Sequence, residues 1–134
     1  MNIVMLLRPK SQVAYLNENN TLRQGLEKMK YHGYTAIPVI NNSGEYVETV
    51  SEGDFLWHLL ENDTHSMVEE EEYLIKDILK PSRNKAIRIN TPIDELLIMV
   101  MDQNYVPVVD DRGVFMGIIT RRDIIKFFYE NKRG

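Results

Sequence analysis

The segment Gly117-Ile118-Ile119-Thr120-Arg121-Arg122-Asp123 has a counterpart 69 positions earlier, Glu48-Thr49-Val50-Ser51-Glu52-Gly53-Asp54. The sequence in front of each segment repeats at the same offset, as Ile37-Pro38-Val39 and Val106-Pro107-Val108. A sequence found twice indicates a pseudo-symmetric pair and not an open solenoid. A pair of this kind has a cleft between its halves, and small ligands usually bind in such clefts.

Working outward, each half has the same order of predicted elements. A short apolar lead-in ends at Pro9 or Pro81, and a short strand, a helix, a β-hairpin and a final helix follow. The fold class is therefore α+β, with one repeat over 1–61, an acidic linker over 62–72 and a second repeat over 73–134. The predicted strands are 13–16, 36–40, 46–50, 86–89, 106–109 and 114–119, and the final helices begin after Ser51 and Thr120.

Two further expectations concern the elements themselves. The helix that begins at Pro92 is apolar on nearly all sides between Leu96 and Met101, so we expect it to be more buried than the helix that begins near Thr21. Pro38 and Pro107 interrupt strands. Because proline cannot donate to a ladder, each marks an edge strand or a gap in the ladder.

The composition excludes several classes of protein. The chain has 134 residues, enough for one compact core, and its net charge of −4 argues against broad nucleic-acid binding. It contains no cysteine, which excludes disulfides and thiolate chemistry and fits a reducing compartment. No segment has the ~18 consecutive apolar residues that a membrane span requires. We therefore expect a cytoplasmic protein that binds neither nucleic acid nor membrane.

The order strand, helix, strand, strand, helix, with a proline inside the middle strand and a Gly-x-x-Thr-x-x-Asp segment, resembles the CBS domain. Residues 117–123 match best, whereas 48–54 have glutamate where the family often has glycine. The resemblance covers almost the whole chain. It implies two β-α-β-β-α repeats packed sheet to sheet as one Bateman module, which binds an adenine nucleotide between its sheets, acts as a sensor and commonly forms a homodimer. It implies no cofactor and no reaction.

A narrower resemblance concerns the ligand. Gln12-Val13-Ala14, residues 33–39 and Thr120-Arg121-Arg122 are similar to small stand-alone CBS proteins of Gram-positive bacteria, some of which bind cyclic di-AMP. Cyclic di-AMP therefore stands beside AMP, ADP and ATP as a candidate ligand. An unidentified protein that the sensor regulates is the expected further partner.

Thr120 and Asp123 can be read in two ways. They form a capping box at the start of the last helix, which needs no ligand. Alternatively, the threonine hydroxyl binds a phosphate or ribose oxygen, the aspartate accepts ribose hydroxyls, and Arg121 or Arg122 binds phosphate in a fork. Arginines in a first helical turn oppose the helix dipole, and a bound anion would remove that conflict.

The first repeat has a weaker version of the same site. Ser51 and Asp54 can bind ribose hydroxyls there, but Glu52 and Gly53 replace the two arginines. An acidic side chain facing phosphate is unfavourable, so we expect this site to be weaker, empty or limited to an adenosine-like group. The resemblance also implies that residues beside the strand prolines and on the first strands contact the purine: Ile37, Pro38, Val106, Pro107, Ala14, Lys85 and Ala86.

Other chemistry has little support in the sequence. Asp54 and His58 are spaced i, i+4, but no third ligand completes a metal site, and an exposed helical pair is expected. The chain has no nucleophile-elbow, phosphate-loop or zincin motif. Two alternatives to a nucleotide sensor remain open: a ligand-free structural or dimerisation module whose repeated segments only cap helices, and a small enzyme that acts on nucleotides.

Overall fold

The computed structural model describes residues 2–62, 71, 73–81 and 83–131, and the chain forms two compact units. The N-terminal unit is Ala14–Arg83, and the C-terminal unit combines Asn84–Gly134 with Met1–Val13. The segment that leads into each repeat therefore belongs to the unit of the other repeat. The boundaries 1–61 and 73–134 stay a prediction of the sequence repeat, and the predicted linker 62–72 lies outside the described residues except for Asn62 and Glu71.

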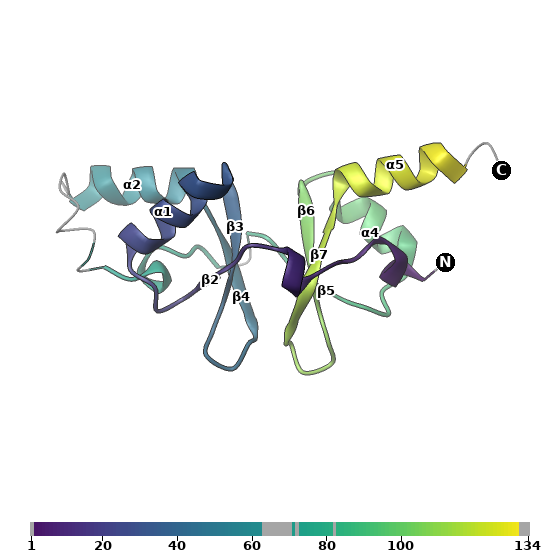
Figure 1. Ribbon diagram of the computed structural model, residues 1–134, viewed down its shortest axis with the longest axis horizontal. Coiled ribbons are helices and arrows are strands. Elements are labelled where there is room, and N and C mark those ends of the chain that lie inside the picture. The colour runs from purple at the N-terminus through teal and green to yellow at the C-terminus, as the bar shows by residue number, and fades with distance from the viewer. Residues whose placement is uncertain (1, 63–70, 72, 82, 132–134) are drawn as a thin grey trace. The chain divides into compact units, whose positions relative to one another are not determined.

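The N-terminal unit is a three-stranded sheet with two helices on one side of it (Figure 1). The strand order is β2-β3-β4, in which β2 and β3 run parallel and β3 and β4 form the predicted antiparallel hairpin. Its elements are β2 (Leu16–Asn17), α1 (Leu22–His32), β3 (Ala36–Ile40), β4 (Tyr46–Ser51), α2 (Glu52–Asn62) and the 3-10 turn η3 (Ile75–Asp77).

Apolar residues at helical spacing form the core between the helices and the sheet of this unit. Leu22 and Met29 of α1 and Phe55 of α2 are buried against the inner side chains of the sheet. Thr21 caps α1 in a full capping box with Gln24, as an N-cap threonine with glutamine three residues later should. Ile75 of η3 is fully buried in the same core, so the segment after α2 completes it.

The C-terminal unit repeats this architecture with one more strand. Its sheet order is β1-β7-β6-β5, and α4 and α5 lie on one side of it (Figure 1). The elements are the 3-10 turn η1 (Ile3–Leu6), β1 (Arg8–Pro9), the 3-10 turn η2 (Lys10–Gln12), β5 (Ile87–Arg88), α4 (Ile93–Met99), β6 (Tyr105–Val109), β7 (Phe115–Thr120) and α5 (Arg121–Asn131).

The extra strand depends on a glycine. β1 pairs antiparallel with β7, and Pro9 lies opposite Gly117. A Cβ atom at Gly117 would lie 2.1 Å from the carbonyl oxygen of Arg8, and the φ angle of Gly117 is +151°. Only glycine tolerates both conditions. The first repeat has Glu48 at this position, and in the described part of the chain its sheet has no corresponding fourth strand.

The α+β class and the order of elements are confirmed, but four details differ from prediction. The strands predicted at 13–16 and 86–89 are only the two-residue strands β2 and β5, because each pairs with just the last two residues of its neighbour. Ile98 is 66% exposed in α4, where only Leu96 is buried, so α4 is not the more buried helix. Pro92 is the N-cap and not the first helical residue. Pro38 and Pro107 lie on central strands, so the edge-strand reading is wrong. The short parallel partners pair only beyond each proline, which leaves a gap in the ladder.

Candidate functional site

Thr120 and Asp123 lie at the start of α5 and make half of the predicted capping box. The backbone N–H of Asp123 donates to Thr120 Oγ1 at 3.0 Å. The Asp123 carboxylate instead accepts a bidentate pair of bonds from Arg8 on β1, from Nε at 2.6 Å and from Nη2 at 3.0 Å. The pairing of β1 with β7 thus delivers an arginine to the predicted ribose-binding aspartate.

This ion pair is partly solvated. The Arg8 side chain is 49% exposed and that of Asp123 is 24% exposed. The hydrogen bonds from Arg8 lower the pKa of Asp123, with smaller contributions from Thr120 and from the charges of Arg8 and Lys126, against the opposing effect of burial. Exposed pairs of this kind contribute about 0–1 kcal/mol to stability. A ligand that offers hydroxyl groups to Asp123 can therefore replace Arg8 at little cost in free energy.

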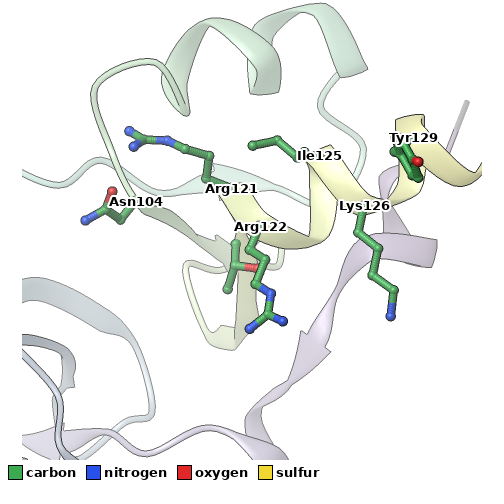
Figure 2. Close-up of a pocket in the computed structure, with 7 residues that line it drawn as sticks. Asn104, Arg121, Arg122, Ile125, Lys126 and Tyr129 are labelled. Carbon is green, nitrogen blue, oxygen red and sulfur yellow. The ribbon is translucent and has the colours of Figure 1, made fainter.

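The two neighbouring arginines have different roles. Arg121 donates from Nε to the carbonyl oxygen of Val100 at 2.6 Å, so it caps the C-terminal end of α4, where a positive charge is favourable. Within the residues that the structure describes, Arg122 makes no hydrogen bond or ion pair. In Figure 2, Arg122 and Lys126 extend to the same side of α5, whereas Arg121 points away from them toward α4.

A pocket of about 600 Å³ lies along this part of α5. Besides the two arginines, it is lined by Asn104, Thr120, Ile125, Lys126 and Tyr129. Asp123 faces a neighbouring hollow of about 260 Å³ between the N-terminal segment and α5, which Lys126 also lines. The pocket thus combines three cationic side chains, of which Arg121 is already bonded to α4, with the hydroxyl of Thr120 near the positive end of a helix, an arrangement that suits an anion.

Ser51 and Asp54 make the full capping box at the start of α2. The Ser51 N–H donates to Asp54 Oδ2 at 2.9 Å, and the Asp54 N–H donates to Ser51 Oγ at 3.4 Å. The guanidinium of Arg83 binds both side chains: Nη1 donates to Ser51 Oγ at 2.9 Å and to Asp54 Oδ2 at 2.7 Å, and Nη2 donates to Asp54 Oδ1. The bonds to Asp54 raise the pKa of Arg83.

This second pair is much less accessible than the first. The Asp54 side chain is 1% exposed and the Arg83 side chain 33% exposed. Removing one partner of a buried pair leaves an uncompensated charge, at a cost of up to about 3–5 kcal/mol. Asp54 and His58 are both buried, so the expected exposed helical pair is wrong. Among the described residues, no group of three His, Asp or Glu side chains could hold a metal ion.

Four of the predicted purine contacts lie on β3 and β6, and the other three lie in the segments just before β2 and β5. Ile37 and Val106 have no exposed surface and pack in the cores, so a purine could reach either residue only if neighbouring segments moved. Pro38 and Pro107 are also buried, Ala14 and Ala86 are half-buried, and Lys85 is exposed. Gln103 Nε2 donates to the carbonyl oxygens of Lys85 and Tyr105 at 3.2 and 3.3 Å, and Tyr105 lies opposite Thr120.

Sequence reasoning missed the residues that complete both sites. Lys126 could have been found, because it follows Arg122 by one helical turn and so lies on the same face. Arg8 and Arg83 reach their aspartates from distant segments through tertiary structure, and no local pattern marks them. No helix among the residues that the structure describes is long and apolar enough to cross a membrane.

Comparisons with known proteins agree with this architecture. A family model of the CBS domain matches residues 6–61 and 75–130. The cyclic di-AMP receptor B of Bacillus subtilis (strain 168) is 30% identical over 120 residues, which cover 86% of this chain and 78% of the receptor. A crystal structure of CbpB in complex with c-di-AMP has a TM-score of 0.90 at 22% identity, over 97% of this chain and 85% of that one. A CBS domain protein from Streptococcus pneumoniae TIGR4 has a TM-score of 0.86 at 26% identity, over 98% of this chain and 88% of its own.

Proposed function

The chain belongs to the CBS domain family, and from this premise we propose that it is a regulatory sensor of an adenine nucleotide with no reaction of its own. Within that class, we propose cyclic di-AMP as the ligand. The support is the similarity to the cyclic di-AMP receptor B of Bacillus subtilis over most of both chains. AMP, ADP and ATP remain the alternatives that share its adenosine group.

One observation carries the assignment to the C-terminal unit: Arg122 and Lys126 extend to one side of α5, along the pocket that Thr120 lines (Figure 2). A phosphate placed there meets these two cations near the N-terminal end of α5, although the N–H groups of Arg121 and Asp123 already donate to the Asn104 carbonyl and to Thr120 Oγ1. Charge-assisted hydrogen bonds to such cations contribute roughly 1.5–3 kcal/mol each. Asp123 would accept the ribose hydroxyls in place of Arg8, while Val106, Pro107, Lys85 and Ala86 would form the purine wall.

A ligand-free structural module is the second candidate, and a specific observation favours it. Asp123 and Asp54 already have arginine partners within the chain, and Ser51 and Thr120 already cap their helices. All four residues are therefore satisfied without nucleotide. The test must show whether these four residues only stabilise the fold or also bind ligand, and it must do so in protein that stays folded.

The test is isothermal titration calorimetry with AMP, ADP, ATP, S-adenosylmethionine and cyclic di-AMP, with thermal melting in parallel. We expect saturable binding of cyclic di-AMP, and a ligand at 100 times its Kd should stabilise the fold by about 2.7 kcal/mol. Asp123→Asn keeps one oxygen that can accept from Arg8 but loses the charge, and an exposed pair of this kind is worth only about 0–1 kcal/mol, so the variant should melt near wild type and bind poorly. Wild-type affinity in Asp123→Asn would make Asp123 only a structural partner of Arg8, and no binding across the whole panel would favour the structural module.

Three further proposals accompany the sensor. We propose that the chain acts as a homodimer, because α2 and α5 both expose large apolar side chains. We propose that it acts in the cytoplasm, where nucleotide second messengers are made and read. A sensor without a reaction needs a protein to regulate, and the ligand would act on that partner by shifting the balance between two states of the sensor.

A further inference from the structure

The structure assigns Arg83 the role of a built-in occupant of the first repeat's nucleotide site, where it keeps nucleotide away from Ser51 and Asp54. This inference rests on the proposed function, because it says which of the two related sites the ligand can enter. The guanidinium of Arg83 contacts both side chains that the ribose would need. Asp54 Oδ2 accepts from Ser51 N–H and from Arg83, and Oδ1 accepts from Arg83, so neither oxygen lacks a donor.

Glu48 places Arg83 at this site. It occupies the repeat position of Gly117, where only glycine allows the lead-in segment to approach as a β-strand. The Glu48 side chain is buried, and its Oε2 accepts the backbone N–H of Arg83 at 3.2 Å. A carboxylate thus holds the lead-in of the second repeat in place of strand pairing, and the guanidinium of Arg83 reaches Asp54 from that anchor.

The two arginine–aspartate pairs differ in a way that decides which site opens. Arg8 and Asp123 are both partly exposed, so water and ribose hydroxyls can compete for the carboxylate. Asp54 is almost completely buried beneath Arg83, and opening that pair leaves a charge without solvent. Glu52 and Gly53 also offer no cation to a phosphate. The ligand therefore enters the Thr120 site and is excluded from the Ser51 site.

The experiment uses the full chain saturated with cyclic di-AMP and then dialysed to equilibrium against radiolabelled adenosine. Adenosine is the probe because Arg83 is held by Asp54, and Glu52 and Gly53 supply no other cation for a phosphate at the Ser51 site. Wild type should take up no adenosine, whereas Arg83→Gln should take up about one per chain, since glutamine leaves the Asp54 carboxylate free for ribose hydroxyls. Arg8→Gln is the matched control and should gain none.

Adenosine uptake by wild type at the Ser51 site, or no uptake by folded Arg83→Gln, overturns the inference. The cyclic di-AMP arm reports on the proposed function separately, and adenosine bound only by Arg83→Gln supports the inference even if cyclic di-AMP binds neither protein. If Arg83→Gln does not fold, amide hydrogen exchange of wild type decides. Unchanged exchange over residues 51–58 with both ligands present supports the inference, and ligand-induced protection there overturns it.

Discussion

Asp54 and Asp123 occupy the same position in the two repeats, yet they have different environments. Each pairs with an arginine from the lead-in segment of the other repeat. The Asp123 pair is open to solvent and lowers the pKa of the carboxyl group, while the Asp54 pair is closed. Asp123 is thus suited to exchange its arginine for a ligand, whereas Asp54 is suited to keep its arginine.

The pKa of Asp123 provides a direct test of its partner. The hydrogen bonds from Arg8 are the largest cause of the lowered pKa, so Arg8→Ala should raise the pKa of Asp123 toward the ordinary aspartate value. A carboxyl NMR titration measures this shift. Lys126→Ala is the control and should raise the pKa less, because its charge is the smallest of the causes.

The lowered pKa of Asp123 also makes the unfolding free energy depend on pH. A lowered pKa in the folded state stabilises the protein above the unfolded-state pKa, and this stability is lost as the pH falls through the folded-state pKa. Wild type should therefore lose more unfolding free energy than Arg8→Ala on acidification through that range. An unchanged Asp123 pKa in Arg8→Ala would mean that the ion pair does not persist in solution.

Arg121 and Arg122 should respond differently to substitution by alanine. Arg122→Ala should weaken cyclic di-AMP binding at least tenfold, because the loss of one charged contact is worth ~1.5 kcal/mol or more. Arg121→Ala should leave affinity near wild type and lower the unfolding free energy by about 0.5–1.5 kcal/mol, because its bond to the Val100 carbonyl is lost. Calorimetry and urea unfolding of both variants measure the two effects, and the reverse assignment would show that Arg121 is the phosphate ligand.

The sequence could predict the residue types of the site but not this division of labour. Consecutive helix positions point about 100° apart, so the two adjacent arginines extend in different directions and only one can bond the end of α4, although both line the pocket. Which one does so depends on where α4 ends, and that is a tertiary contact. The same holds for Ile37 and Val106, whose side chains belong to the cores although their strands were placed correctly.

Among the elements, β1 is the strand whose place could not be predicted. Two residues carry too little pattern to indicate a strand, and its partner β7 is more than a hundred residues away in sequence. The hairpins, by contrast, were predictable because strands rich in β-branched residues flank turn residues. The prediction that α4 is the more buried helix was wrong for a related reason. An apolar composition does not show which sides of a short helix pack against a neighbour.

Gly117→Ala tests the contact that holds β1. Its Cβ would meet the Arg8 carbonyl oxygen at 2.1 Å in a backbone conformation that side chains disfavour, so β1 must move. We expect a loss of about 1–3 kcal/mol in the unfolding free energy, and faster amide exchange of Arg8. Because Arg8 moves with β1, the pKa of Asp123 should rise as it does in Arg8→Ala.

Gly53→Ala is the matched control for that change. Its Cβ would lie 3.6 Å from Ser51 Oγ, an ordinary contact, and alanine favours the helix. Its stability should equal or exceed that of wild type by up to about 1 kcal/mol in urea unfolding. Equal stability of Gly117→Ala and Gly53→Ala would show that β1 does not depend on a close approach at Gly117.

For the whole molecule, the exposed apolar side chains repeat with the sequence. Leu56 and Leu60 on α2 are 55% and 64% exposed, and their repeat partners Ile125 and Tyr129 on α5 are each 62% exposed. The run Phe127-Phe128-Tyr129 exceeds what one helix face can bury and so indicates surplus apolar surface on the last helix. The structure adds a similar surplus on α2. It could not predict that the compact units exchange their lead-in segments, because that exchange depends on contacts between residues far apart in the chain.

A homodimer that covers these helices is the expected state in solution. Stable interfaces bury about 1,200–2,000 Å² in total, and large apolar side chains at their centre supply most of the affinity. Wild type should therefore have the mass of a dimer by light scattering at micromolar concentration. Leu60→Glu combined with Tyr129→Glu should shift it to monomer, because each buried carboxylate would lack a partner. Tyr31→Glu, at an 85% exposed aromatic residue on α1, is the control and should stay dimeric. A monomeric wild type would contradict the proposal, and a dimeric double variant would place the interface elsewhere.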